Sequence, residues 1–399
     1  MSKTIDLPID VMQMILERCE YPVVQTVRKA NSVLRDLVAK VSPKSTITSI
    51  AIKSCKDSIQ LSLTSGDPDS KNSKALYPKG IKLNIQYQSD KKGCWVVLEK
   101  KGDKKFKKFL REDIFRKIFW QPKKLLRGEN FRKIFWQDFK ILMDYHKDTL
   151  LENFELNFEM VDINLDQNSR KEALKDHYTK FLDDVRDFFV SKPGTSLKVQ
   201  NFTMRTENEQ SLLFILDLFD SNFLEGIKVS SVFSLPKRGF IGSRQPVWSN
   251  EKFRDLEQWR KAERVEINDF EMFDIEDVLH FKTVKGRMMW ILMEDLSRFV
   301  DSIFTTTTNP GNKHYHIIGS AFFMNTIRIL YGDSQDKTWY FSIPGNNTVV
   351  ELFMSPKSFQ LKGMKLGDVE QGREIHTWVD QDDDFDVMAM LEEEEEEEN

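Results

Sequence analysis

One spacing of apolar residues recurs four times in the second half of the chain and limits the folds that are open to it. Each copy reads apolar-x-x-apolar-x-apolar, and a helical pattern separates most copies from the next. The copies are Leu151, Phe154, Leu156; Val199, Phe202, Met204; Leu224, Ile227, Val229; and Ala262, Val265, Ile267. The expected helices lie at 169–189, 208–218, 250–259 and 293–304. This order predicts neighbouring strands whose outer side is covered by helices.

The frame is the strand signature of leucine-rich repeats. Its copies begin at residues 151, 199, 224 and 262, so the spacings are irregular. We therefore predict an irregular LRR-like strand–helix stack. Repeat stacks usually bind along their strand face, which makes the exposed residues between the frame positions the candidate substrate-binding residues. These residues are Glu155, Thr203, Lys228 and Glu266.

Residues 46–98 are strand-rich, with apolar and polar residues in alternation. The alternating apolar residues are Ile59, Leu61, Leu63 and, after a loop, Ile81, Leu83, Ile85, Tyr87. We expect an antiparallel sheet here. Near the end, residues 339–343 and 349–354 flank Pro-Gly-Asn-Asn, which predicts a hairpin.

The first forty residues predict three short amphipathic helices. Pro8 and Pro22 suit first-turn positions, where a missing N–H costs nothing. Apolar residues recur at steps of three and four, at Val11, Met14, Ile15, Val23, Val24, Val27, Leu34, Leu37 and Val38. A piece of this size cannot bury a sufficient core alone, so it needs a partner.

The order of residues in this segment closely resembles an F-box, which binds Skp-family adaptors in cullin–RING ubiquitin ligases. The matching residues are Leu7-Pro8, Ile15-Leu16-Glu17, Tyr21, Arg28-Lys29 and Leu34-Arg35, whereas Cys19, Ala30 and Asn31 depart from the pattern. The resemblance implies an apolar adaptor-facing surface made by Leu7, Pro8, Ile15, Leu16, Val23, Val24 and Val27.

The second half resembles the FTH domain, which follows the F-box in a large nematode family of presumed substrate receptors. The resemblance is carried by Glu257–Ala262, Val265–Ile267, His280-Phe281, Asp295-Leu296 and Tyr340–Pro344. Together the two resemblances imply a non-catalytic substrate-recognition subunit of an SCF-type E3 ubiquitin ligase. Its partners would be a Skp-family adaptor, through it a cullin, and an unknown protein client.

A basic, aromatic segment leaves an alternative open. Residues 100–133 hold fourteen Lys or Arg against four acids, and Phe115–Gln121 recurs as Phe131–Gln137. Cations beside rings are what single-stranded nucleic-acid binding uses, so an RNA-associated protein acting through residues 100–136 is the rival hypothesis. Aromatic residues at helical spacing are more often core, which makes nucleic-acid binding the less favoured interpretation.

The remaining patterns exclude other classes of protein. No catalytic constellation or phosphate loop occurs, and we expect no enzyme activity, no cofactor and no metal. His314 and His316 would share a strand face but have no third ligand at metal spacing. The chain has no secretory signal, no apolar stretch of membrane-spanning length and only 3 Cys, so we expect a location in the cytoplasm or nucleus and no membrane.

We thus predict a mixed α/β fold: an N-terminal three-helix F-box-like module, an antiparallel strand-rich segment and the LRR-like stack. The expected boundaries are 1–42 for the F-box-like module, 43–100 for the strand-rich segment, 101–137 for the basic insert, 138–366 for the FTH-like α/β domain, and 367–399 for an acidic disordered tail. An acidic run repels itself, and its ordinary role is to aid solubility. The opposite charges also allow the tail to screen the basic segment.

Overall fold

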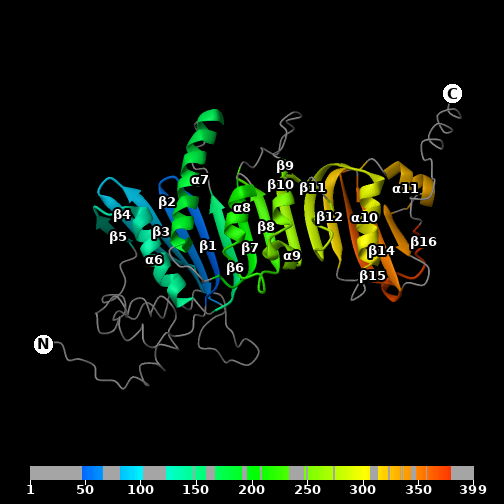
Figure 1. Ribbon diagram of the computed structural model, residues 1–399, viewed down its shortest axis with the longest axis horizontal. Coiled ribbons are helices and arrows are strands. Elements are labelled where there is room, and N and C mark those ends of the chain that lie inside the picture. Colours follow the sequence, from blue (N-terminus) through cyan, green and yellow to red (C-terminus); the bar gives the residue numbers. More distant parts are fainter. Residues whose placement is uncertain are drawn as a thin grey trace, which may run out of the picture. The chain divides into compact units, whose positions relative to one another are not determined.

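The computed structural model describes the chain in segments and divides it into two compact units. The described residues are 47–65, 81–101, 123–146, 149–158, 167–190, 196–206, 209–232, 247–248, 250–272, 275–305, 313–321, 324–332, 334, 336–342, 347–355 and 357–378. Unit 1 comprises Met1–Arg205 and Leu218–Leu224, and unit 2 comprises Thr206–Asp217 and Glu225–Asn399. Strands dominate both units, as the ribbon in Figure 1 shows.

Unit 1 is built on a sheet whose strands pair in the order β5-β4-β3-β2-β1-β6-β7. Their bounds are β5 Lys123–Arg127, β4 Gly93–Lys101, β3 Ile81–Asp90, β2 Ser58–Ser65, β1 Ile47–Cys55, β6 Leu151–Phe158 and β7 Val199–Thr206. Pairing is antiparallel from β5 to β1. It becomes parallel between β1 and β6 and between β6 and β7. The antiparallel pairing agrees with the alternation in residues 46–98.

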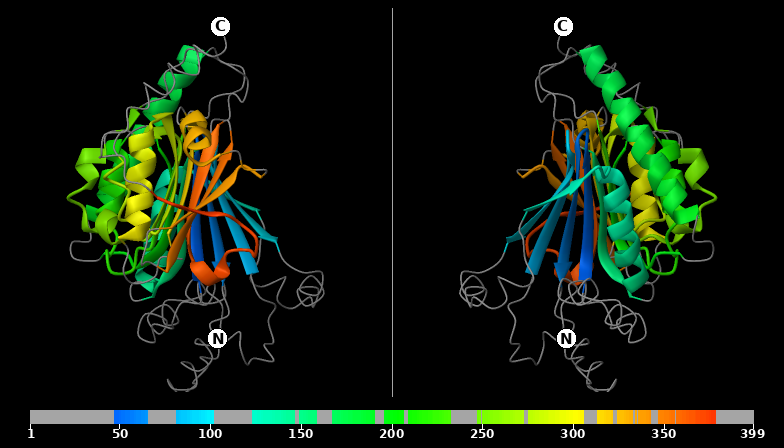
Figure 2. Two further views of the ribbon diagram at one scale, coloured as in Figure 1. Left: turned by 90° about the vertical axis from the view of Figure 1, so that its right-hand side faces the viewer. Right: turned by 90° about the vertical axis from the view of Figure 1, so that its left-hand side faces the viewer.

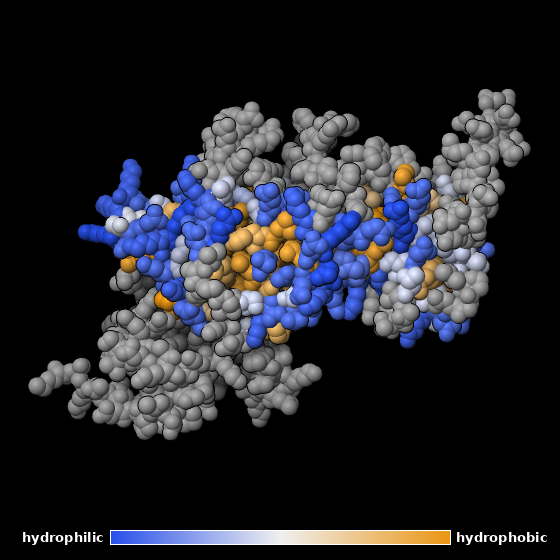
Figure 3. All heavy atoms as spheres, viewed as in Figure 1, coloured by the Kyte–Doolittle hydropathy of each residue, from blue (hydrophilic) through white to orange (hydrophobic). Residues whose placement is uncertain are grey.

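Helix α6 (Phe131–Tyr145) shows why the second copy of the basic repeat folds as it does. The side chain of Asn130 caps the helix by accepting a hydrogen bond from the backbone N–H of Arg132, at 2.8 Å. Phe135 and Phe139, four residues apart, point inward and are buried. Helix α6 contacts β2, β3 and β4, and Lys133, Gln137 and Lys140 face outward. Figure 3 shows the resulting hydrophilic outer surface over α6, β4 and β5.

The aromatic rings of this copy are structural. Phe135 lies edge-on to Tyr87, with 5.6 Å between ring centroids, and Trp136 packs against Phe181 and Phe188 of α7 (Gln167–Val190). Rings packed in this way offer no free face on which a base can stack. The second copy therefore belongs to the core of unit 1. The rings on which the base-stacking hypothesis rests are Phe106, Phe109, Phe115, Phe119 and Trp120, which lie outside the described residues, so that hypothesis stays a prediction.

Unit 2 is built on a sheet whose strands pair in the order β8-β10-β11-β12-β15-β14-β13-β16, with β9 beside β10. Their bounds are β8 Gly226–Ser231, β9 Val247–Trp248, β10 Arg264–Met272, β11 Thr283–Ile291, β12 His314–Ala321, β13 Thr338–Ser342, β14 Thr348–Ser355, β15 Ser358–Lys365 and β16 Ile375–Thr377. Strands β8 to β12 are parallel, as is β16 beside β13. Antiparallel pairs join β12 to β15, β15 to β14 and β14 to β13. The hairpin predicted at 339–354 is confirmed by the last of these pairs.

The helices of each unit lie on one side of its strands (Figure 2). In unit 2 they are α8 Glu209–Leu216, α9 Glu257–Lys261, α10 Met293–Phe304 and α11 Met324–Tyr331, with short 3-10 turns at Asn250–Phe253 and Leu366–Asp368. Helix α10 packs on β14 and β15. Phe299 of α10 contacts Tyr315 and Phe359, with centroid separations of 4.8 and 5.8 Å. None of the described helices lies on the opposite face of the unit 2 sheet.

The apolar frames mark real strands, but the fold class predicted from them is wrong. Leu151, Phe154 and Leu156 stand directly beside Val199, Phe202 and Met204, and Ile227 stands beside Val265. The structure is nevertheless a mostly-strand sheet architecture with few helices, and not a mixed α/β strand–helix stack. After β12 the chain returns through antiparallel strands, which a repeat with one parallel strand per unit does not do.

The expected three-helix module and the adaptor-facing residues fall at positions 7–38, outside the described residues. Among the helices that the structure describes, none is long and apolar enough to cross a membrane.

Candidate functional site: a polar strand face

The side of the unit 2 sheet opposite the described helices carries a polar surface, which we call the polar strand face. Side chains alternate across a strand, so directly paired residues share a face. The residues of this face are Lys228, Glu266, Lys285, Arg287, His314, His316, Ile318, Gln360, Lys362, Glu351 and Phe353. The intervening residues, such as Val265, Val284, Tyr315 and Leu361, are buried toward the helices.

A three-residue charge ladder crosses β8, β10 and β11. Lys228, Glu266 and Lys285 are direct neighbours in the strand register. One carboxylate oxygen of Glu266 accepts hydrogen bonds from the Nζ of Lys228 at 3.0 Å and the Nζ of Lys285 at 3.1 Å. It also accepts one from the side-chain amide of Asn268, at 2.9 Å. The carboxylate is thereby fixed between two cations.

The ladder changes the acidity of Glu266. Burial by itself raises the pKa of this carboxyl group, because the charged form loses solvent. Hydrogen bonds from Asn268, Lys228 and Lys285 outweigh that effect and lower the pKa to about 2. Glu266 is therefore ionised at every physiological pH, and the ladder carries one net positive charge.

Two histidines continue the face toward β15. His316 stands beside Lys285 and Gln360, and His314 stands beside Lys362. Burial is the main cause that lowers the pKa of both imidazoles, and the neighbouring lysine lowers each further. The two rings share a face, as the sequence predicted. Across the described chain, no group of three or more His, Cys, Asp or Glu residues is placed to hold a metal ion.

Positive charge exceeds negative charge on the polar strand face. The cations are Lys228, Lys285, Arg287 and Lys362, and the anions are Glu266 and Glu351. Arg287 stands beside Glu271 in the strand register, and Lys362 stands beside Glu351. Phe353 is 38% exposed on β14, the last strand of this surface, beside Gln360, and Ile318 is half-buried on β12 next to Arg287. The surface thus joins an excess of cations to one exposed aromatic side chain.

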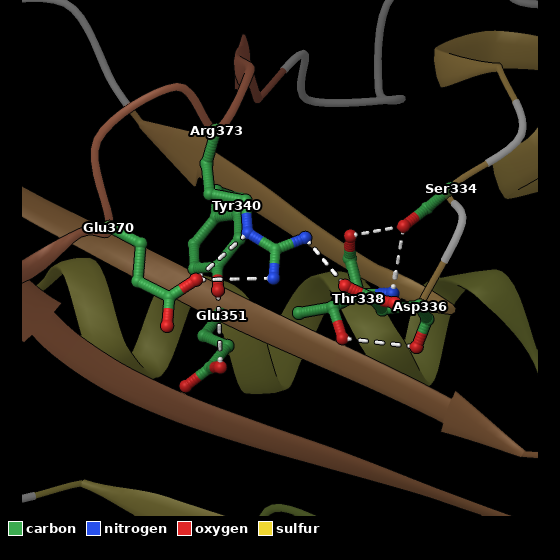
Figure 4. Close-up of polar contacts among 7 residues, drawn as sticks. All are labelled: Ser334, Asp336, Thr338, Tyr340, Glu351, Glu370 and Arg373. Atoms are coloured by element: carbon green, nitrogen blue, oxygen red, sulfur yellow. Dashed lines mark hydrogen bonds and ion pairs between the residues drawn. The ribbon is translucent and has the colours of Figure 1, made fainter.

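A second polar cluster fixes the end of unit 2 (Figure 4). Arg373 bonds to Asp336 at 2.7 Å and to Glu370 at 3.2 Å, which ties the segment before β16 to the start of β13. Ser334, Thr338, Tyr340 and Glu351 complete the cluster, and the hydroxyl of Tyr340 donates to Glu351 at 3.4 Å. These groups hold one another, so the cluster is an anchor for β16.

The structure places the four candidate substrate-binding residues in two pairs. Lys228 and Glu266 are in direct contact in unit 2. Glu155 and Thr203 stand side by side on β6 and β7 in unit 1, and the side-chain amide of Asn157 donates to Glu155. The frame missed Lys285 and Lys362, because β11 and β15 do not carry it. The alternation Val284, Gly286, Met288 against Lys285 and Arg287 was the available signal.

Comparison with known proteins identifies one domain in the chain. Residues 179–328 match the family described as FTH domain. An F-box is not detected. No curated protein and no solved structure matches the chain. The chain therefore carries an FTH domain, and this match includes Lys228, Glu266, Lys285 and both histidines of the polar strand face.

Proposed function

We propose that this protein is the client-recognition subunit of an SCF-type E3 ubiquitin ligase and has no catalytic role of its own. The observation that carries the proposal is the FTH domain at residues 179–328. The order of residues 7–35, which resembles an F-box, supports it from the sequence. In this proposal residues 1–42 dock on a Skp-family adaptor, and through it on a cullin, in the cytoplasm or nucleus.

The mechanism we propose is proximity. A receptor that holds a client beside the ligase turns a collision between two proteins into a reaction within one complex. The gain is an effective concentration, which needs binding surfaces and no reactive side chain. A non-catalytic role therefore suits the surfaces described above, which bind through charge and shape.

The polar strand face is our proposed client surface. Its backbone is fixed in paired strands, so little backbone conformational freedom remains to be lost when a client binds. An excess of cations on the same face as exposed Phe353 favours a client segment with acidic residues beside an apolar one. Lys228 and Glu266 form part of this surface, and Lys285 and Lys362 extend it.

The adaptor half of the proposal is tested by changing Leu7→Asp together with Pro8→Ala. We expect adaptor co-purification to be lost, because a single buried side chain at such an interface is worth about 2–4 kcal/mol. The matched control is Ser2→Ala with Lys3→Asp, which changes two residues just outside the F-box-like order and should leave co-purification intact. Unaltered adaptor binding in the Leu7/Pro8 variant would contradict the proposal.

The client half is tested by Lys228→Glu with Lys285→Glu, which reverses both cations of the ladder. Proximity labelling in cells should then lose client proteins while the adaptor is still labelled. Lys133→Glu with Lys140→Glu on the outer side of α6 gives the same change of net charge and should label the same clients as the unmodified chain. Identical client sets for all three chains would contradict the assignment of this surface.

A further inference from the structure

The polar strand face has an acidic counterpart in the same chain. Residues 380–399 contain an apolar block between two acidic blocks. The acidic residues are Asp380, Asp382, Asp383, Asp384, Asp386 and Glu392–Glu398, and the apolar ones are Phe385, Val387, Met388, Met390 and Leu391. We propose that residues 380–399 bind the polar strand face of their own chain and compete there with other acidic segments.

The pattern of the tail complements the pattern of the face. On the face, Phe353 is 38% exposed on β14, and Lys362 on β15 and Lys285 on β11 follow it across the sheet, with half-buried Ile318 on β12 between the two lysines. In the tail, acids flank Phe385 and the apolar residues after it. Docking would therefore cover exposed apolar area and neutralise cations in the same contact. A segment that is acidic but not apolar would neutralise the cations without covering the exposed apolar area.

The last described residues fix the point from which the tail leaves unit 2. Arg373 and its partners anchor the segment before β16, and the backbone N–H of Trp378 donates to Ser342 at 2.9 Å. Trp378 is buried against Phe341 and Tyr331. The chain thus leaves unit 2 from a fixed point at the edge strand β16. Both the tail's origin and its proposed site belong to the same unit.

The tail is long enough to reach the polar strand face. In the strand order β16-β13-β14-β15-β12-β11, five steps separate the edge from Lys285 on β11. At about 4.8 Å per step this is roughly 24 Å. Residues 379–399 span at most about 70 Å when extended, at roughly 3.3 Å per residue. The apolar block, which starts at Phe385, reaches Phe353 two steps from the edge with chain to spare.

Tail docking would regulate client access, and this consequence rests on the proposed function, although the contact itself does not. A tethered segment is present at a high effective concentration, so even weak contacts keep it in place. A client with a stronger acidic and apolar segment would displace it. The tail would thereby reject weakly acidic proteins from the surface.

A binding titration tests the contact without any client or adaptor. The probe is a fluorescent peptide of residues 380–399, and its partners are the full chain and a chain truncated after Val379. We expect the truncated chain to bind the peptide at least about tenfold more tightly than the full chain, because the tethered copy competes. Affinity for the truncated chain should also fall with salt. Equal affinity for the two chains, or no binding to the truncated one, would overturn the proposal.

Charge reversal locates the contact. Lys285→Glu with Lys362→Glu in the truncated chain should weaken peptide binding by about tenfold or more, and Lys133→Glu with Lys140→Glu should not. Thermal unfolding of both variants, together with Lys285→Gln and Lys362→Gln, separates a lost contact from a lost fold. Equal weakening by the two reversals would contradict a specific site.

Carbodiimide cross-linking of the full chain separates a contact within one chain from one between two. The reagent joins a carboxylate to a lysine amine in direct contact. In a mixture of isotopically light and heavy protein, we expect only light–light and heavy–heavy links between Glu392–Glu398 and Lys285 or Lys362. Light–heavy links at the frequency that random pairing of chains gives, or links only to lysines in residues 100–133, would overturn the proposal.

Discussion

Replacing Glu266 by Gln measures how much the charge ladder contributes to the free energy of unfolding. The change keeps the size of the side chain and removes the charge that Lys228 and Lys285 share. A fall in pKa from 4.5 to about 2 corresponds to roughly 3 kcal/mol at about 1.36 kcal/mol per pH unit. The lysine side chains are 48% and 42% exposed, so solvent screens part of this energy. We expect the variant to lower the free energy of unfolding by about 1–2 kcal/mol at pH 7.

The stabilisation that Glu266 contributes depends on pH in a defined direction. A carboxyl group with a lowered pKa stabilises the folded state fully above its ordinary pKa, and this stabilisation is lost as the pH falls through the folded value. The difference between the unmodified chain and Glu266→Gln should therefore shrink from pH 4.5 to about 2. Chemical denaturation across this range measures it, and hydrogen exchange of the β10 and β11 amides assigns the effect to unit 2.

The matched control is Glu263→Gln, because Glu263 pairs with Lys282 just before β10 and β11 begin and its side chain is 44% exposed. Exposed pairs of this kind contribute about 0–1 kcal/mol. Equal losses for the two variants would refute the reasoning, since they would show that the hydrogen bonds to Glu266 add nothing. A loss for Glu266→Gln that stays constant down to pH 2 would refute it as well, because the effect would not be electrostatic.

Two further changes test the packing of unit 1. Phe135→Ala should lower the free energy of unfolding by about 3–5 kcal/mol, because this side chain is fully buried between α6 and the sheet. The control Lys133→Ala should lower it by less than about 0.5 kcal/mol. Denaturant melts measure both changes. Gly93→Ala should destabilise the β4–β5 pair by at least about 1–3 kcal/mol, because Gly93 has φ +143° and a Cβ would lie 2.0 Å from the Leu126 carbonyl oxygen. Hydrogen exchange at β5 measures it, and Gly367→Ala, where no atom lies within 4 Å of the added Cβ, is the control. Unchanged exchange in Gly93→Ala would contradict the local geometry.

Local periodicity predicted much of the strand content. Alternation marked the antiparallel strands of unit 1, and the frames marked β6, β7, β8 and β10 with their side chains in phase. Both signals are local, because they depend only on which side chains face the core. The sheet order is not local. It depends on which strand pairs with the chain's return after β12, and a frame says nothing of that choice.

Local periodicity also predicted part of the polar strand face. Lys228 and Glu266 lie between frame positions, so the frame placed them on one face. Lys362 comes to that face through the antiparallel pair of β15 with β12, which no repeat pattern contains. The nucleic-acid hypothesis rested on cations interleaved with aromatic residues at 106–120, which lie outside the described residues, so it stays a prediction. In the second copy of the repeat, the helical spacing of Phe131, Phe135 and Phe139 indicated a core-facing side, and these three side chains are buried.

The central claim is that this chain joins a client to a ligase through two separate surfaces. Quantitative measurement of ubiquitinated proteins tests it in cells that lack the chain and receive it back unmodified, with Leu7→Asp and Pro8→Ala, or with Lys228→Glu and Lys285→Glu. The account predicts a set of proteins whose ubiquitination rises only with the unmodified chain. The same set rising with all three chains, or no set rising with any, would contradict it.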